Sequence, residues 1–330
     1  MLSREVPRAG DTAVNFPVFG PNGRHDLRTD PHLVDEKRHL RAETNWRHFL
    51  DSVCTRAECG AEVTAEFRKT FFKARRTNID RFIQRYEKDF GMVARLQIAA
   101  TILNCERDDW LDGDWYSQLL EDMAPNDPDD VQRGRLSVIT FNYDRSFERF
   151  FTSAFEHSFR LTKPEAFKVF ERIQLVHVYG TLGTLGNMPF GKVDYARDAA
   201  ERISFIRDAR RPSCKAELEK AIRGATNVCF IGFGFAPENL ALFNPRWFVN
   251  KNLKATSRGL SLNRMSEVQK KLKHIEWVQG SAVDLLNSYN IFETKKAAAK
   301  VKQLPVRRST SNFVRSATPN PTNPWMRGLR

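Results

Sequence analysis

The stretch Leu136-Ser-Val-Ile-Thr-Phe-Asn-Tyr-Asp144 joins a short apolar run to a polar turn, and the pattern of the chain changes there. Before it, apolar residues recur at helical spacing. After it, short apolar runs alternate with helical segments. Runs that are apolar at every position and alternate with helices are typical of a parallel sheet covered on both faces. The sequence therefore predicts an α/β fold with a doubly wound parallel sheet.

Five short runs are predicted as strands. They are residues 136–141, 173–178, 227–231, 259–262 and 274–278. Between the first two, phenylalanines at positions 147, 151 and 155 have helical spacing. The sequence Thr162-Lys-Pro-Glu165 has the pattern of a capping box and predicts the start of another helix.

The flanking segments differ in composition from this α/β region. Residues 1–32 are punctuated by proline and glycine and are predicted to be irregular, and residues 33–130 are predicted to be helical. The α/β domain is expected over 131–294. The helical region is then an insertion toward its N-terminal side. A tail of residues 295–330 completes the predicted organisation.

The predicted tail carries most of the net positive charge. The chain of 330 residues has a formal net charge of +13, and nine basic residues and no acid lie after residue 294. Few apolar residues are present there to offset the entropy of ordering, so we predict a disordered basic tail. It is either a solvated tail or a source of weak, non-specific contact with nucleic acid.

Composition also excludes several classes of protein. The first ten residues contain no apolar signal-peptide core, and the best apolar stretch, residues 96–103, is far shorter than the roughly 20 residues of a membrane-spanning helix. Five cysteines at irregular spacing argue against a disulfide framework and favour the reducing cytoplasm. Cys54 and Cys59 lack a second pair of ligands, so no metal site is expected.

Three polar turns follow the predicted strands. They are Thr140–Asp144, His177–Gly180 and Gly232–Asn239. The carboxyl ends of parallel strands lie along one edge of a sheet, where ligands bind in the crevice. We therefore expect these turns to meet around a common site.

The third turn, Gly232-Phe-Gly234-Phe-Ala-Pro237, suits a nucleotide ligand. Glycines let backbone amides approach a phosphate or a ribose closely. Pro237 is placed to start a helix whose amino end favours an anion.

The first two turns carry the polar side chains. Asn142 and Asp144 offer donors and acceptors for a carboxamide, and His177 could act as a base or bind a sugar hydroxyl. Structural alternatives exist for each residue. Asn142 could adopt a turn conformation, Asp144 could cap the following helix, and His177 could be a satisfied core histidine.

These segments resemble the SIR2-like family, the bacterial relatives of the sirtuins. The resemblance rests on Val138–Asp144, Val176–Gly180 and Cys229–Asn239, with weaker likeness at Asn78–Phe82 and Asp114–Tyr116. It runs from about residue 78 to about residue 286. The combination of Phe-Asn-Tyr-Asp with Gly-Phe-Gly is more specific than either motif alone.

The resemblance implies a Rossmann-like fold that binds NAD as substrate or ligand. Many SIR2-like proteins of bacterial antiphage systems hydrolyse NAD to nicotinamide and ADP-ribose, so a second copy of the chain or a defence-system protein is an expected partner. Carried over, Asn142 orients the ribose or the attacking water, Asp144 accepts a hydrogen bond from the carboxamide, and Gly232–Asn239 contacts the adenosine side. The catalytic candidates are thus Asn142, Asp144 and His177. The binding candidates are Thr140, Tyr179, Gly180, Gly232, Gly234 and Asn239.

The chain departs from the family pattern in three ways. The usual Gly-rich loop is absent, with residues 18–23 at best a degenerate remnant, and its loss could leave the sheet without its first strand. Tyr179 stands where the family has its catalytic histidine, while His177 lies two residues earlier on the same strand face. No four-cysteine zinc module is present, so a protein deacylase is not expected. An NAD glycohydrolase is the first hypothesis, an inactive module that binds NAD or an ADP-ribose derivative the second, and a nucleic-acid-associated protein the third.

Overall fold

The structure is a computed structural model, and it describes residues 33–74, 79–111, 115–133, 135–205, 212–289 and 291–292. The predicted irregular segment 1–32 and the predicted tail 295–330 lie outside these residues. The chain divides into one compact unit that ends at Phe292 and a second that begins at Glu293. The description below concerns the first unit.

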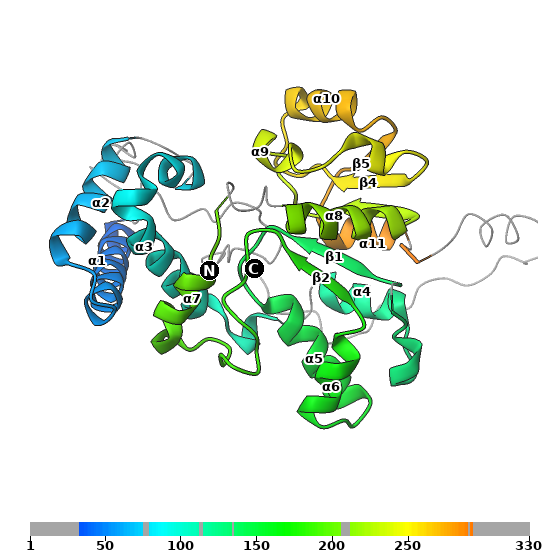
Figure 1. The fold of residues 1–330 in the computed structure, drawn as a ribbon, viewed down its shortest axis with the longest axis horizontal. Helices are drawn as coiled ribbons and strands as arrows, with labels where there is room; N and C mark the ends of the chain where they lie inside the picture. Colours follow the sequence, from blue (N-terminus) through cyan, green and yellow to red (C-terminus); the bar gives the residue numbers. More distant parts are fainter. Residues whose placement is uncertain are drawn as a thin grey trace, which may run out of the picture. The chain divides into compact units, whose positions relative to one another are not determined.

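Helices form the N-terminal part of this unit (Figure 1). They are α1 (Leu33–Arg56), α2 (Ala61–Lys73), α3 (Ile79–Cys105) and α4 (Trp115–Met123), with single turns of 3-10 helix at Asp108–Trp110 and Pro128–Asp130. Aromatic rings pack between α2 and α3. The ring of Phe67 lies 6.0 Å from that of Phe82 and 5.7 Å from that of Phe90. These rings are part of a larger hydrophobic core that also contains residues of the strands described below.

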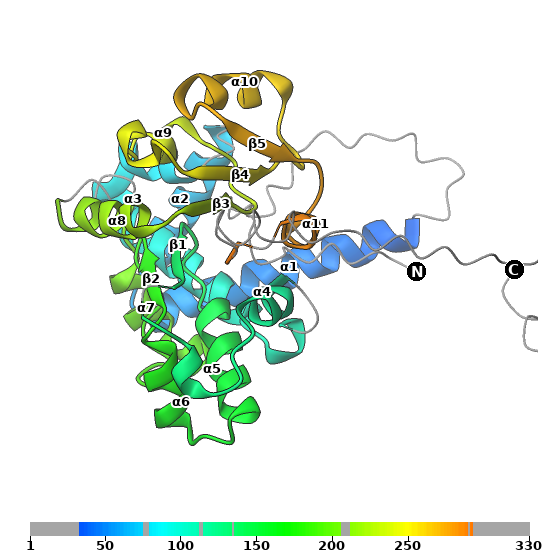
Figure 2. The same cartoon turned by 90° about the vertical axis from the view of Figure 1, so that its right-hand side faces the viewer.

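Five parallel strands follow, arranged in two sheets. They are β1 (Ser137–Thr140), β2 (Gln174–His177), β3 (Asn227–Phe230), β4 (Asn252–Thr256) and β5 (Ile275–Val278). One sheet pairs β1 with β2, and the other has the order β3-β4-β5. Figure 2 shows β3 to β5 on one side of β1 and β2. The fold is therefore of the mixed α/β kind, with short parallel sheets.

The remaining helices alternate with these strands. They are α5 (Ser146–Ser158), α6 (Lys163–Phe170), α7 (Ala196–Arg202), α8 (Pro212–Gly224), α9 (Pro237–Leu240), α10 (Leu262–Lys271) and α11 (Ala282–Ser288), with 3-10 turns at Val193–Tyr195 and Pro245–Phe248. The capping box predicted before α6 is confirmed, because the Thr162 N–H donates to Glu165 Oε2 at 2.9 Å.

Both faces of the strands pack against helices. Side chains of successive strand residues point to opposite faces. One face carries Val176, Phe230, Leu253, Ala255 and Ile275, and the other carries Val138, Leu175, Cys229, Ile231 and Val278. The first set shares a core with α3, α7, α8 and α10, and the second with α4, α5, α6 and α11. The expectation of a sheet region covered on both faces is met by these two cores.

The helical region and the strands belong to the same unit. Helices α1 to α3 contribute to the core on the first face of the strands. Arg95 of α3 donates from Nε to the Ile203 carbonyl, which follows α7, at 3.0 Å, and its guanidinium lies 4.5 Å from the Phe205 ring. The predicted boundary at residue 130 therefore separates two kinds of secondary structure within one packed body.

One predicted strand is wrong. Residues 259–262 form a turn and the start of α10, because Gly259 has φ +79° and Ser261 caps the helix by accepting from the Arg264 N–H. The strand of this region is β4, which the sequence analysis missed. Lys254 separates its apolar residues Leu253 and Ala255, whereas each of the four predicted strands that formed has two adjacent apolar residues.

No helix in the described part of the chain is long and apolar enough to cross a membrane.

Candidate functional site

The predicted residues Asn142 and His177 lie side by side at the carboxyl ends of β1 and β2. In the strand register Thr140 is opposite His177. The Asn142 N–H donates to Thr140 Oγ1 at 3.1 Å, which bends the chain as it leaves β1. The Asn142 carbonyl lies 3.1 Å from His177 Nδ1. Two of the three predicted catalytic residues are therefore in direct contact.

Both ring nitrogens of His177 are engaged. Nε2 lies 2.9 Å from Glu148 Oε1 on α5, and both side chains are nearly nine-tenths buried. Burial lowers the pKa of His177. The hydrogen bond and negative charge of Glu148, with the Asn142 carbonyl and the charge of Asp144, outweigh that effect, so the pKa is raised. In its protonated form, which the raised pKa favours, the ring donates to both the Asn142 carbonyl and Glu148.

Glu148 is a site residue that the sequence analysis missed. Its second carboxylate oxygen, Oε2, is buried and has no hydrogen-bond partner in the described structure. The residue lies one turn after Asp144, on the helix face that faces β2. Its position four residues after Asp144, at the start of the predicted helix, is the signal that could have identified it.

Asp144 lies one residue before Arg145, which is the N-cap of α5, so the interpretation of Asp144 as the N-cap is not met. Its Oδ1 accepts from the Ser146 N–H at 3.0 Å, at the start of α5. This leaves the side chain half-buried beside the turn that carries Asn142. The geometry places Asp144 next to the site, with one oxygen committed to the helix.

A buried ion pair anchors this turn. Arg145 is fully buried, and Glu106, just after α3, is 1% exposed. Arg145 donates to Glu106 from Nε at 2.9 Å and also from Nη2, and from Nη1 to the Met188 carbonyl. The Gly191 N–H donates to Glu106 Oε2 at 3.1 Å. The sequence analysis did not identify this network, which ties the helical region to the first turn.

Tyr179 and Asn239 connect the second turn to the third. The Tyr179 hydroxyl donates to Asn239 Oδ1, and both residues are buried. Gly180 has φ +82°, and a Cβ there would collide with the Arg202 carbonyl. The carbonyl of Tyr179 accepts from the Ser204 N–H at 2.8 Å, which fixes the turn after β2.

The third turn is fixed by a hydrogen bond to the end of β4 and by packing against the residue that follows β1. Gly232 has φ +59°, and its N–H donates to Thr256 Oγ1 at 2.9 Å. Phe233 packs on Phe141, the residue after β1, with ring centres 5.0 Å apart. Gly234 lies in the same loop. Pro237 starts α9 as predicted, although α9 is a single turn.

The three turns therefore share one edge. Asn142 contacts His177, Tyr179 contacts Asn239, and Phe141 contacts Phe233. The described residues contain no group of three or more His, Cys, Asp or Glu side chains suited to a metal ion. The five cysteines are free thiols.

A scan against protein-family models, a search of curated proteins and a search of solved structures each return no match to this chain.

Proposed function

We propose that the edge formed by the turns after β1, β2 and β3 binds NAD or a related ADP-ribose nucleotide, in a doubly wound, Rossmann-like arrangement. The observation that carries this proposal is the hydrogen bond from Tyr179 to Asn239, because it joins the turn after β2 to the Gly-Phe-Gly loop. The contact between Asn142 and His177 adds the first turn to the same edge. Ligands of open parallel sheets bind at such an edge.

The proposed reaction is hydrolysis of the bond between nicotinamide and ribose. Water attacks the ribose C1′, the C–N bond breaks, and its electron pair neutralises the charge on the nicotinamide nitrogen. The proton of the attacking water leaves to solvent or to a carboxylate. Positive charge builds on the ribose in the transition state, as in glycoside hydrolysis. Asn142 is proposed to orient the water or a ribose hydroxyl, and Asp144 to accept from the carboxamide.

His177 takes a different role in this proposal from the one expected of a base. A ring that donates from both nitrogens has no free lone pair to receive a proton. We assign His177 as a positioning residue, which fixes the Asn142 backbone through Nδ1 while Glu148 holds its other nitrogen. The engaged histidine also favours the second candidate function, a module that binds NAD without turnover.

One pair of measurements tests both candidates. Purified protein is incubated with NAD and released nicotinamide is quantified by chromatography, while calorimetry measures binding. The glycohydrolase predicts release that is lost in Asn142→Ala and retained in Asn104→Ala, a control at an exposed asparagine on α3. Binding without release identifies the module. A wild-type protein that neither binds nor cleaves NAD refutes both.

A further inference from the structure

The outer edge of β5 is open. This strand is last in its sheet, and no strand lies beyond it within the described residues. The Val278 carbonyl accepts from the Ser257 N–H on the β4 side, at 2.9 Å. Backbone groups of successive strand residues point to opposite edges, so the N–H and C=O of Trp277 point outward. An edge of this kind is a template for another strand.

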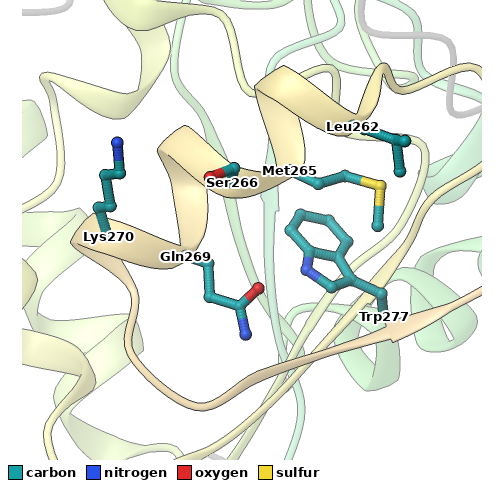
Figure 3. A pocket seen from close by; sticks show the side chains of 6 residues that line it. All are labelled: Leu262, Met265, Ser266, Gln269, Lys270 and Trp277. Carbon is teal, nitrogen blue, oxygen red and sulfur yellow. The ribbon is translucent and has the colours of Figure 1, made fainter.

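A pocket lies beside this edge, under helix α10 (Figure 3). Trp277 lines it together with Leu262, Met265, Ser266, Gln269 and Lys270. The five helix residues recur at steps of three and one, which form a single stripe on the helix surface. Val268, between them in sequence, is instead fully buried in the core. α10 thus uses one stripe for the fold and a second for the pocket.

The pocket has apolar and polar features that the fold does not use. Leu262 is 82% exposed, although it is a leucine beside a tryptophan and a methionine. In Figure 3 the Met265 side chain lies next to the Trp277 indole, with Gln269 and Lys270 further along the helix. The indole Nε1 is buried and has no acceptor among the residues that the structure describes. A buried donor without a partner costs free energy, which an acceptor brought by a ligand would recover.

The surroundings of the pocket are basic on balance, because Glu267 and Glu276 are paired with Arg264 and Lys254. Lys270, Lys271 and Lys273 are exposed, and none of the three forms an ion pair among the described residues. The net charge of the chain is +13, and residues 295–330 contain no acid. A second copy of the chain or its own C-terminal segment would therefore be repelled, whereas an acidic partner is attracted.

We propose that the pocket and the outer edge of β5 together bind an extended, acidic peptide segment of a partner protein, which pairs with β5 as an added strand. Main-chain hydrogen bonds to Trp277 supply affinity, and a pocket for alternate side chains supplies selectivity. The residue opposite Trp277 on the same face projects under α10 and places a large apolar side chain between Leu262 and Met265. Acidic residues beside it meet the lysines.

A random peptide library displayed on phage, panned against the full-length chain, tests the proposal. The expected sequences carry a large apolar residue flanked by aspartate or glutamate. An enriched peptide is then synthesised with a fluorescent label, and binding is followed by anisotropy. Leu262→Asp is expected to weaken binding about tenfold, from the lost burial of part of a leucine side chain. Val249→Asp, at another exposed apolar residue, leaves it unchanged.

Charge and backbone pairing have separate controls. Lys270→Glu weakens binding, whereas Lys220→Glu on α8, with the same change in net charge, does not. N-methylation of alternate peptide amides abolishes binding in one register only, because only alternate amides face β5. Three results would overturn the proposal. They are a failure to enrich any sequence, equal binding to Leu262→Asp and wild type, and self-association of the chain that Leu262→Asp removes.

Discussion

Removing the carboxylate of Glu106 is the sharpest test of how the first turn is held. Glu106 accepts from Arg145 N at 3.2 Å, from Nε at 2.9 Å, from Nη2, and from Gly191 N at 3.1 Å. Glu106→Ala leaves a fully buried guanidinium with only the Met188 and Pro189 carbonyls as acceptors. Breaking one side of a buried pair costs about 3–5 kcal/mol, and we expect that loss of stability in urea unfolding followed by circular dichroism.

The double variant Glu106→Leu/Arg145→Met distinguishes charge from packing. It removes both charges, so the desolvation penalty disappears, but two backbone N–H groups lose their acceptor at about 1 kcal/mol each. We therefore expect a loss of about 2 kcal/mol, smaller than that of Glu106→Ala. Asp109→Ala, in an exposed pair with Arg107, is the control and should leave the midpoint unchanged. A loss below about 1 kcal/mol for Glu106→Ala would refute the reasoning. So would a loss in the double variant equal to the sum of the losses in the single variants Glu106→Leu and Arg145→Met.

Three further predictions concern His177, Gly180 and Cys229. Because the pKa of His177 is raised in the fold, its pairing with Glu148 stabilises the protein below pH about 6.5 and the benefit fades as pH rises through the folded pKa. Urea unfolding of wild type and His177→Gln at several pH values should therefore converge on the alkaline side. Gly180→Ala should lower the free energy of unfolding by at least about 1–2 kcal/mol, measured by the same assay, because alanine disfavours φ +82° and its Cβ meets the Arg202 carbonyl. Burial raises the pKa of Cys229 to about 12, so this thiol should resist iodoacetamide at pH 8 until the protein unfolds, as read by peptide mass spectrometry.

Much of the strand pattern could be predicted because it is local. The runs around β1, β2, β3 and β5 each contain at least two adjacent apolar residues, and that property is visible in the sequence. β4 was missed because Lys254 stands at its centre. In the fold its ammonium pairs with Glu276 of β5 and lies 4.5 Å from the Tyr289 ring. Those partners are distant in sequence, so the sequence pattern alone cannot show that the lysine is accommodated.

The candidate site could also be predicted only in part. The closeness of Asn142 and His177 follows from the rule that parallel strands end at one edge. Their supporting partners do not follow from that rule. Glu148 on α5 and Glu106 just after α3 lie 29 and 39 positions from His177 and Arg145. Which carboxylate reaches a buried cation depends on how helices pack on the sheet. The nucleotide specificity of the edge stays a prediction.

The break between β1 and β3 has a mechanical consequence. No main-chain hydrogen bond joins these two strands in the described part of the chain, and the seam between them is closed by rings such as Phe141 and Phe233. Ring packing resists sliding less than a ladder of directional bonds does. A ligand that contacted Asn142 after β1 and Gly232 after β3 would link the two sheets. Ligand binding would then reduce the relative motion of the two sheets, and amide hydrogen exchange would become slower in both β1 and β3.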